Sequence, residues 1–352
     1  MIDLYPILRP LLFACEPERA HRLAVRALAS GLAPARSTAD DPILSTTVFG
    51  RHFANPIGMA AGFDKNAEAI DGLFGLGFGF VEIGTVTPRP QDGNPKPRLF
   101  RLRADRAIIN RLGFNGAGMA AVAERLAAGS RRRGILGINI GKNRDSPDAA
   151  ADYAAVTRAL GRFADYLVIN VSSPNTPGLR ALQGKDELPA LVASVRAALQ
   201  DVAGERQVPL LVKIAPDLSS EERADVASIA IGAPVDGLIV GNTTLSRPAT
   251  LADPCRAEAG GLSGRPLFDL STTVLRDMRR RTAGRIPLIG VGGVGSGGEA
   301  YAKIRAGASL VQLYSALVYE GPALVGRIKR ELATLIRRDG FATVAEAVGR
   351  DV

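Results

Sequence analysis

The sequence predicts an α/β protein, a (β/α)₈ TIM barrel with a small N-terminal helical extension. Three observations carry this prediction. Eight short apolar segments alternate with helical patterns along most of the chain. The 352 residues fit one barrel-sized domain plus an appendage better than two equal domains. Polar residues follow all eight apolar segments, where barrels of this kind carry their active sites.

Composition narrows the classes of protein. Apolar residues make up 46% and charged residues 22%, as in globular domains, and the net charge of +9 favours anionic partners. Cys15 and Cys255 are far apart, which argues against disulfides and against zinc or iron–sulfur sites, so no metal is expected. The two histidines are His21 and His52, so proton transfer in the barrel must use another residue type. We expect neither a transmembrane helix nor a signal peptide.

Residues 1–36 form the predicted extension. Leucines and an isoleucine at helical spacing predict a first helix: Leu4, Ile7, Leu8, Leu11 and Leu12. A second helix starts near Glu16–Pro17 and ends at Gly31, with three arginines on its polar side. The pair could lie on an anionic membrane surface or pack as a hairpin on the main domain. Pro34 to Asp41 is interpreted as a linker, and 42–352 as the catalytic domain.

The barrel pattern begins after a hairpin whose strands are predicted at 47–49 and 52–54. The eight predicted strands cover 57–61, 80–85, 136–140, 167–169, 210–214, 237–240, 286–291 and 310–313. Helical patterns between them include 149–164, 188–202, 220–231, 271–280 and 297–306. Prolines stiffen the segment 86–100, which is either a shield for the site or a plain rigid connection.

The most informative stretch follows the fourth strand and reads Asn-Val-Ser-Ser-Pro-Asn-Thr, from Asn170 to Thr176. Amide side chains both donate and accept hydrogen bonds, so paired amides suit a planar heterocycle with alternating C=O and N–H groups. Ser173 could transfer a proton or only cap a turn. Lys213, on the fifth strand, could stabilise the negative charge of a reduced flavin or form a structural ion pair.

Gly290–Gly295 matches G-x-G-x-x-G between a strand and a helix. The dinucleotide interpretation is rejected because no acidic residue follows at the end of the next strand. Backbone N–H groups of this turn and the following helix N-terminus predict a phosphate site. Such sites are frequent after strands 7 and 8, which makes flavin mononucleotide (FMN) the natural candidate. In the segment 110–115, Arg111 could bind a ligand or form a salt bridge.

Taken together, several segments resemble the membrane-associated, quinone-dependent class of dihydroorotate dehydrogenases. The resemblance covers nearly the whole chain, and the segments are Ala60–Lys65, Glu82–Pro90, Asn110–Asn115, Asn170–Thr176, Gly260–Pro266 and Val291–Gly293. It implies a flavin-binding (β/α)₈ barrel that oxidises dihydroorotate to orotate in pyrimidine biosynthesis. Serine at position 173, where the soluble class has cysteine, and the N-terminal extension both imply ubiquinone or menaquinone as acceptor.

The resemblance also implies roles for individual residues. Ser173 would be the catalytic base, and Lys65 would meet the substrate carboxylate. Substrate contacts are implied at Lys65, Asn110, Arg111, Leu112, Gly113, Phe114, Asn170, Asn175, Asn242 and Thr243. FMN contacts are implied at Ala61, Gly62, Phe63, Asp64, Lys65, Thr85, Asn139, Asn170, Lys213, Gly241, Gly264, Gly293, Tyr314 and Ser315. His21, Arg101 and Tyr314 match positions near the family's quinone tunnel.

The implied partners are dihydroorotate, a quinone and a membrane surface reached by the N-terminal helices, without nucleic acid and with a monomeric chain. For a bacterial source this means the cytoplasmic face of the inner membrane. Three alternatives stay open: a flavin barrel that reduces uridines in transfer RNA, a non-catalytic flavin or phosphate-binding module, and a soluble-class enzyme with another acceptor. The first is disfavoured because no basic stripe with stacking aromatics is evident.

Overall fold

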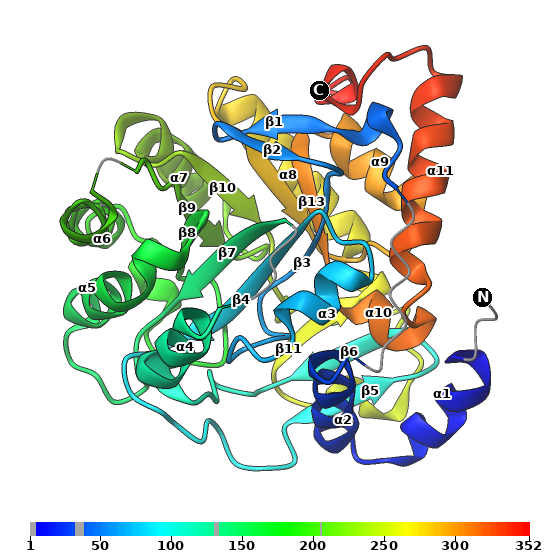
Figure 1. Cartoon of the computed structure of the whole chain (residues 1–352), viewed down its shortest axis with the longest axis horizontal. Coiled ribbons are helices and arrows are strands. Elements are labelled where there is room, and N and C mark those ends of the chain that lie inside the picture. Colours follow the sequence, from blue (N-terminus) through cyan, green and yellow to red (C-terminus); the bar gives the residue numbers. More distant parts are fainter. Residues whose placement is uncertain (1–4, 32–38, 130–133, 205) are drawn as a thin grey trace.

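A closed barrel of eight parallel strands forms the centre of the computed structural model, which describes residues 5–31, 39–129, 134–204 and 206–352 (Figure 1). Around the barrel the order is β3, β4, β7, β8, β9, β10, β12 and β13, and β13 pairs with β3 to close it. The strands are Ile57–Met59, Phe80–Val86, Ile135–Ile140, Tyr166–Asn170, Leu210–Ile214, Gly237–Val240, Leu288–Val291 and Ala308–Leu313. The predicted fold class and the order of all eight strands are therefore confirmed.

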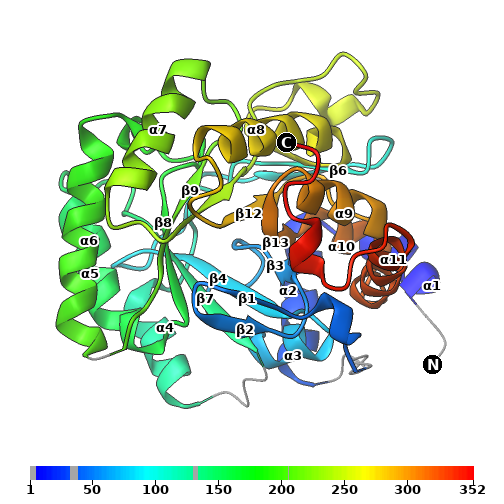
Figure 2. The ribbon, with the colours of Figure 1, turned by 90° about the horizontal axis from the view of Figure 1, so that it is seen from above.

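Helices cover the outside of the barrel (Figure 2). The five helical patterns correspond to α5 (Ala149–Leu160), α6 (Glu187–Ala203), α7 (Ser220–Gly232), α8 (Phe268–Arg281) and α9 (Gly297–Arg305). The sequence analysis did not assign α3 (Ile70–Gly75), α4 (Gly118–Ala127), α10 (Ser315–Glu320) or α11 (Leu324–Arg338). Two of these have six residues each, too short for a helical period to stand out.

Aromatic rings fill the barrel interior opposite glycines. A Cβ atom on Gly58 would lie 2.3 Å from the Phe80 ring, and one on Gly137 would lie 2.1 Å from the Tyr166 ring. Phe53 packs edge-on against Phe80, with ring centroids 5.5 Å apart, and belongs to the hairpin of β1 (Thr46–Val48) and β2 (Arg51–Phe53). This predicted hairpin therefore closes one end of the barrel, and a functional cavity must lie at the other (Figure 1).

That other end carries a small antiparallel sheet with no counterpart in the sequence analysis. It consists of β5 (Leu99–Leu102), β6 (Ala107–Asn110) and β11 (Gly261–Gly264). Strand β6 pairs Asn110 with Gly261, more than a hundred positions away in the chain. Local pattern could not reveal it, since these short strands become recognisable only when the distant segments pair.

Both N-terminal helices are present, as α1 (Tyr5–Ala14) and α2 (Pro17–Ala29), and the Glu16 carboxylate caps α2 as its start was predicted. Val25 and Leu28 of α2 join the main hydrophobic core, so this helix packs on the catalytic domain. Ile7, Leu8 and Leu11 of α1 are exposed apolar side chains. In the described ranges no helix is long and apolar enough to cross a membrane. Residues 34–38 of the predicted linker, and Leu4 of the predicted first helix, lie outside the described residues.

A buried ion pair fixes α2 to the barrel end. Arg98 Nη2 lies 2.8 Å from Glu18 Oε1, and Arg98 Nε donates to Glu18 Oε2 at 3.0 Å. Both side chains are less than a tenth exposed. The hydrogen bond from Arg98 lowers the pKa of Glu18. The stabilisation by this pair is therefore present above the ordinary carboxyl pKa near 4.5 and is lost as the pH falls through the lowered value.

Replacing Arg98 by Met should detach α2, because the buried Glu18 carboxylate loses both hydrogen bonds from Arg98 and keeps only the half-exposed Lys96, at 3.7 Å, as a cationic partner. The expected local cost is roughly 3–5 kcal/mol. Hydrogen exchange of the α2 amides should accelerate strongly at neutral pH. Arg26→Met, on an exposed position of the same helix, is the matched control. Slow exchange in both variants would show that the apolar contacts of Val25 and Leu28 hold the helix alone.

Candidate active site

Beside a larger cavity of about 730 Å³, a cavity of about 350 Å³ opens among the carboxyl ends of the barrel strands and under the small sheet. This volume lies in the range of small-molecule sites. Eighteen of the residues implied by the resemblance line it: Ala61, Gly62, Lys65, Thr85, Asn110, Leu112, Gly113, Phe114, Asn170, Ser173, Asn175, Lys213, Asn242, Thr243, Gly264, Gly293, Tyr314 and Ser315. Residues that are spread along the barrel sequence, from Ala61 to Ser315, therefore line one cavity.

Five of the residues implied for substrate or FMN do not line this cavity. Phe63 and Asp64 line a neighbouring cavity instead. Arg111 Nη1 forms an ion pair with Glu258 at 2.7 Å, which is the alternative that the sequence left open. Asn139 is fully buried and donates and accepts hydrogen bonds within the barrel. Gly241 is backbone-packed, since a Cβ there would lie 2.5 Å from the Val291 carbonyl oxygen.

The amides form hydrogen-bonded pairs at the cavity wall. Asn175 Nδ2 donates to Asn110 Oδ1 at 3.1 Å, which joins the loop after β8 to the end of β6. Asn242 Nδ2, after β10, donates to Ser172 Oγ at 2.8 Å. Each amide keeps further donor or acceptor capacity. The wall can therefore offer alternating donors and acceptors to a planar ring.

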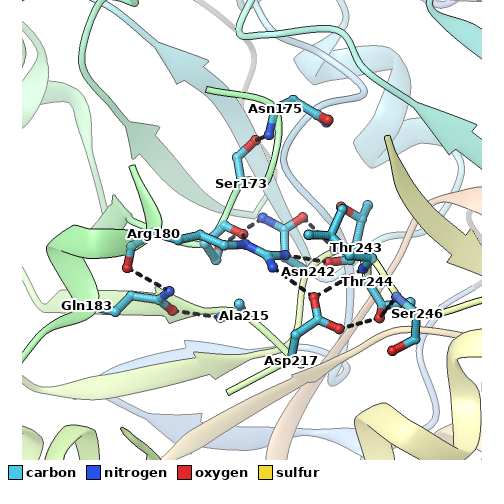
Figure 3. Close-up of polar contacts among 12 residues, drawn as sticks. Ser173, Asn175, Arg180, Gln183, Ala215, Asp217, Asn242, Thr243, Thr244 and Ser246 are labelled. Atoms are coloured by element: carbon cyan, nitrogen blue, oxygen red, sulfur yellow. Dashed lines mark hydrogen bonds and ion pairs between the residues drawn. The ribbon is translucent and has the colours of Figure 1, made fainter. Parts of the chain in front are cut away.

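Arg180 holds the serine loop against the neighbouring strand end (Figure 3). Its Nε donates to the Ser172 carbonyl oxygen at 3.0 Å and its Nη2 to the Thr243 carbonyl oxygen at 3.1 Å. Its Nη1 lies 2.8 Å from Asp217 Oδ2, and Asp217 also accepts the Thr244 hydroxyl. The sequence analysis did not identify this arginine, because its role depends on carbonyl groups from two separate loops.

Ser173 caps a turn and also lines the cavity, where a proton-transfer group would have to lie. Its Oγ accepts the backbone N–H of Asn175 at 3.3 Å, as a turn cap does (Figure 3), and the residue also lines the cavity. Three residues on, the buried Thr176 hydroxyl has no hydrogen-bond partner within the described part of the chain. A buried polar atom without a partner carries a free-energy cost, and Thr176 is not among the residues that line the cavity.

Two lysines bring positive charge to the cavity. Lys213 on β9 is buried, with Nζ 4.0 Å from Glu82 Oε1, and burial lowers its pKa. Lys65 donates a hydrogen bond to Asn115 Oδ1. Removal from water, and next the positive charge of Arg98, lower the pKa of Lys65 to about 7. An anionic ligand would stabilise the ammonium form of either side chain.

The structure changes one part of the predicted phosphate site, the contribution of the helix N-terminus. Gly292, Gly293 and Val294 line the cavity, and a Cβ on Gly293 would lie 2.5 Å from Phe268, so backbone alone fits there. The N-terminus of α9, however, is occupied by the protein itself. Glu299 Oε2 accepts the Gly295 N–H at 2.7 Å, and Glu331 accepts the Gly297 N–H at 2.7 Å. An anion would therefore use the glycine turn and the nearby Ser315, rather than that helix N-terminus.

A second cavity lies between α2 and the loop 91–98 and shares Lys65, Leu99, Leu112 and Tyr314 with the first. His21 lines it, with ring centroids 5.1 Å from Phe63 and 6.4 Å from Tyr314. Burial, and next the charge of Lys65, lower the pKa of His21 to about 4, so the imidazole is neutral at pH 7. Arg101 instead donates to carbonyl oxygens of Leu12 and Cys15, at the α1–α2 connection.

The small sheet supplies lining residues that sequence reasoning missed. They include Leu99, Ile108 and Ser263 of the strands and Arg106 of the turn between β5 and β6, which forms an ion pair with Glu320. Ser263 Oγ lies 2.8 Å from Ser315 Oγ, which links the sheet to the end of β13. The segment 260–266 was recognised only through the family resemblance, so no local signal separated these residues from an ordinary loop.

A TIM barrel whose strand ends gather amides, a serine and two lysines around one cavity is the usual arrangement of an enzyme for a small polar ligand. Comparison with known proteins gives the family. The model of the family described as dihydroorotate dehydrogenase matches residues 43–336. A relative from Rhodospirillum rubrum, named dihydroorotate dehydrogenase (quinone), is 60% identical over 351 residues, which cover 100% of this chain and 95% of the relative. The mitochondrial relative from Mus musculus is 54% identical, with coverage of 99% and 89%.

Solved structures agree with this result. A crystal structure of DHODH from Eimeria tenella in complex with ferulenol superposes with a TM-score of 0.93 at 43% identity, covering 97% of this chain and 98% of that one. Its ligand-free form gives a TM-score of 0.92 at 45% identity, with coverage of 95% and 99%. The chain therefore belongs to the dihydroorotate dehydrogenase family, and its relatives place it in the quinone-dependent class of these oxidoreductases.

Proposed function

We propose that this chain oxidises (S)-dihydroorotate to orotate in de novo pyrimidine biosynthesis, with FMN as hydride acceptor and a quinone as final acceptor. The observation that carries the proposal is the meeting of Ser173, Lys65 and the paired amides in one cavity with the glycine turn and Lys213. A serine, a cation and amides match the C5 proton, the carboxylate and the ureide face of dihydroorotate.

The cavity also fits FMN. The turn at Gly292 and Gly293 leaves no room for side chains, which suits the close approach of a phosphate. Lys213 is buried at the wall, where it can balance negative charge on a reduced isoalloxazine ring. Thr85 and Asn170 can hold the ring from the ends of β4 and β8. FMN, when bound, supplies the acceptor for the hydride that leaves C6 of dihydroorotate.

The chain's own residues carry the rest of the reaction. Asn110, Asn175, Asn242 and Thr243 would hold the pyrimidine ring, and Lys65 would bind its carboxylate. Ser173 Oγ would take the proton from C5. Serine is a poor base at its ordinary pKa, so its own proton needs an acceptor. An oriented water, the Thr176 hydroxyl or the bound flavin would assist this step, and that hydroxyl is buried with no hydrogen-bond partner among the described residues.

The proposed binding site of the quinone, the final electron acceptor, is the second cavity. A neutral His21 ring, Phe63 and Tyr314 form an aromatic wall of this cavity, and Tyr314 also lines the first cavity, so the wall suits an uncharged ring such as ubiquinone or menaquinone. The exposed Ile7, Leu8 and Leu11 of α1 would lie on a membrane surface. In a bacterial cell this would be the cytoplasmic face of the inner membrane, with the chain as a peripheral monomer.

An anaerobic experiment tests this proposal. The purified holoenzyme is mixed with dihydroorotate, the flavin absorbance is followed, and a ubiquinone analogue is then added. Bleaching followed by quinone-driven recovery is the expected result. Bleaching without recovery would contradict the quinone acceptor and keep the pyrimidine chemistry. A flavin that dihydroorotate does not bleach would contradict the proposed reaction.

A further inference from the structure

The loop after β8 carries Ser173 and Asn175 but has few hydrogen bonds to the rest of the barrel. Within the described part of the chain, residues 174–178 form hydrogen bonds to residues more than five positions away only at Asn175. The Asn175 side chain donates to Asn110 Oδ1 at 3.1 Å, and its backbone carbonyl oxygen accepts from Asn94 Nδ2 at 3.1 Å. The hydrogen bonds that hold Asn175 at the cavity wall therefore come from two residues.

The first of these residues, Asn110, is held in place by the small sheet. It lies in β6, between its register partners Leu99 of β5 and Gly261 of β11. Its position therefore does not depend on Asn94. The second residue, Asn94, lies in the loop 91–98 and lines the second cavity and not the first. It holds the backbone of Asn175 from behind the wall, without facing the proposed substrate.

Asn94 joins the two segments whose amides pair at the cavity wall. Its Nδ2 has two hydrogens. It donates to the Arg111 carbonyl oxygen at 3.0 Å, directly after Asn110, and to the Asn175 carbonyl oxygen at 3.1 Å. One amide thus connects two backbone carbonyl groups that are far apart in the sequence. Behind the side-chain pair of Asn110 and Asn175, the same two segments are joined a second time through their backbones.

The place and orientation of the Asn94 amide are themselves fixed by its neighbours. Its Oδ1 accepts from Arg144 Nη1 at 3.0 Å, and a guanidinium can only donate, so the amide nitrogen is turned toward the two carbonyl groups. The backbone N–H of Asn94 donates to the Leu112 carbonyl oxygen at 3.0 Å, and its backbone carbonyl oxygen accepts from Arg98 Nη1 at 2.8 Å. A Cβ on Gly113 would lie 2.8 Å from the Asn94 amide, so the two segments are in close contact.

We propose that Asn94 is a positioning residue that sets the place of Asn175 in the pyrimidine site, by joining the backbone of Asn175 to the segment that follows Asn110. This inference rests on the proposed function, because the ligand of Asn175 is taken to be dihydroorotate or orotate. No hydrogen bond within the described ranges joins Asn94 to Lys213 or to the glycine turn, which are the groups proposed to hold FMN. Loss of the Asn94 amide should therefore affect the pyrimidine and leave FMN binding in place.

The test compares orotate binding to the holoenzyme, followed by the flavin absorbance, with FMN binding to the apoprotein, followed by quenching of flavin fluorescence. Asn94→Leu removes both donors with little change in side-chain size. It should weaken orotate binding by about tenfold or more, since a displaced Asn175 leaves a polar group of the ligand unpaired. FMN affinity should stay within about threefold of the wild-type value, which a general loss of structure would not allow.

Arg144→Met is the matched control. Arg144 is exposed, and its replacement removes the hydrogen bond to Asn94 Oδ1 while both donations from Nδ2 stay possible. Both affinities should remain within about threefold of the wild-type values. A loss of orotate affinity as large as that of Asn94→Leu would assign the effect to the contact with Arg144 and overturn the inference.

A double-mutant cycle with Asn175→Ala shows whether Asn94 acts through Asn175. The Asn175→Ala protein keeps the backbone carbonyl group that Asn94 binds, but it has no amide to place in the cavity. In this background Asn94→Leu should change orotate affinity by no more than about threefold. An equal loss of affinity in both backgrounds would mean that Asn94 acts by another route, and the inference would be wrong.

The remaining outcomes separate this inference from the proposed function. Unchanged orotate affinity in Asn94→Leu, or a parallel loss of FMN affinity, overturns the inference and leaves the proposed function untouched. If Asn94→Leu does not fold, Asn94→Ala removes the same donors without apolar bulk at this half-buried position, with the same expected results. An Asn94→Ala protein that does not fold either overturns the inference. A wild-type holoenzyme whose flavin responds to neither orotate nor dihydroorotate overturns the proposed function together with it.

Discussion

Replacing Ser173 by Ala should slow reduction of the bound flavin by dihydroorotate by two to four orders of magnitude. Loss of a positioned general base typically costs this much. The side chain is small, lies at the cavity wall, and only accepts a backbone N–H of Asn175 at 3.3 Å, so its removal should leave the loop in place. Arg180 holds that loop through backbone carbonyl groups, independently of the Ser173 hydroxyl.

Rapid mixing under anaerobic conditions measures this step apart from reoxidation. Orotate binding serves as the control and should change by less than about threefold, because Ser173 acts on the C5 proton rather than on the ring edge. Ser173→Cys should retain part of the rate, since a thiolate can also accept a proton. A normal rate of flavin reduction in Ser173→Ala would disprove the assignment of the base.

The second large effect concerns Lys65 and the pH dependence of orotate binding. Burial, with the added charge of Arg98, lowers the pKa of Lys65 to about 7, so the free enzyme loses this positive charge near neutral pH. Orotate is an anion and should bind the ammonium form. Its dissociation constant should therefore be constant below about pH 7 and rise about tenfold per pH unit above it.

Lys65→Met should remove this dependence and weaken orotate binding at pH 6 by roughly ten- to hundredfold, the value of a charged hydrogen bond. Titrations of the flavin absorbance with orotate from about pH 5.5 to about pH 9 give both the pH dependence of the dissociation constant and the loss of affinity in the variant. Lys142→Met is a suitable control, since Lys142 lies outside the cavity and donates to the Ser146 carbonyl. A flat pH profile in the wild-type enzyme would show that Lys65 keeps its proton throughout.

Much of the site could be predicted from sequence because strand ends are local features. Asn170, Lys213 and Tyr314 each lie on or directly after a short apolar segment, and a parallel barrel brings all such ends to one side. The structure confirms that these residues share one cavity. The roles of Ser173 and Lys65 came from the family resemblance, and they remain predictions until the experiments above are done.

Other features needed contacts between distant residues. Arg111 could have bound a ligand, but the structure pairs it with Glu258, which only the fold brings near. The N-terminus of α9 was expected to be free for a phosphate, but Glu299 and Glu331 accept its N–H groups. Arg180 belongs to no motif, and its role follows from the carbonyl groups of two separate loops that the fold places around it.

The sequence by itself determined the eight-stranded barrel, the order of its strands and the polar character of its mouth. Hydrophobic periodicity and turn residues are local, and the closure of the barrel then follows from burying the apolar strands. Only the tertiary structure decided the sheet of β5, β6 and β11 and the two adjoining cavities. These depend on which segments, distant in the sequence, meet at the carboxyl ends of the barrel strands, and no local pattern encodes those contacts.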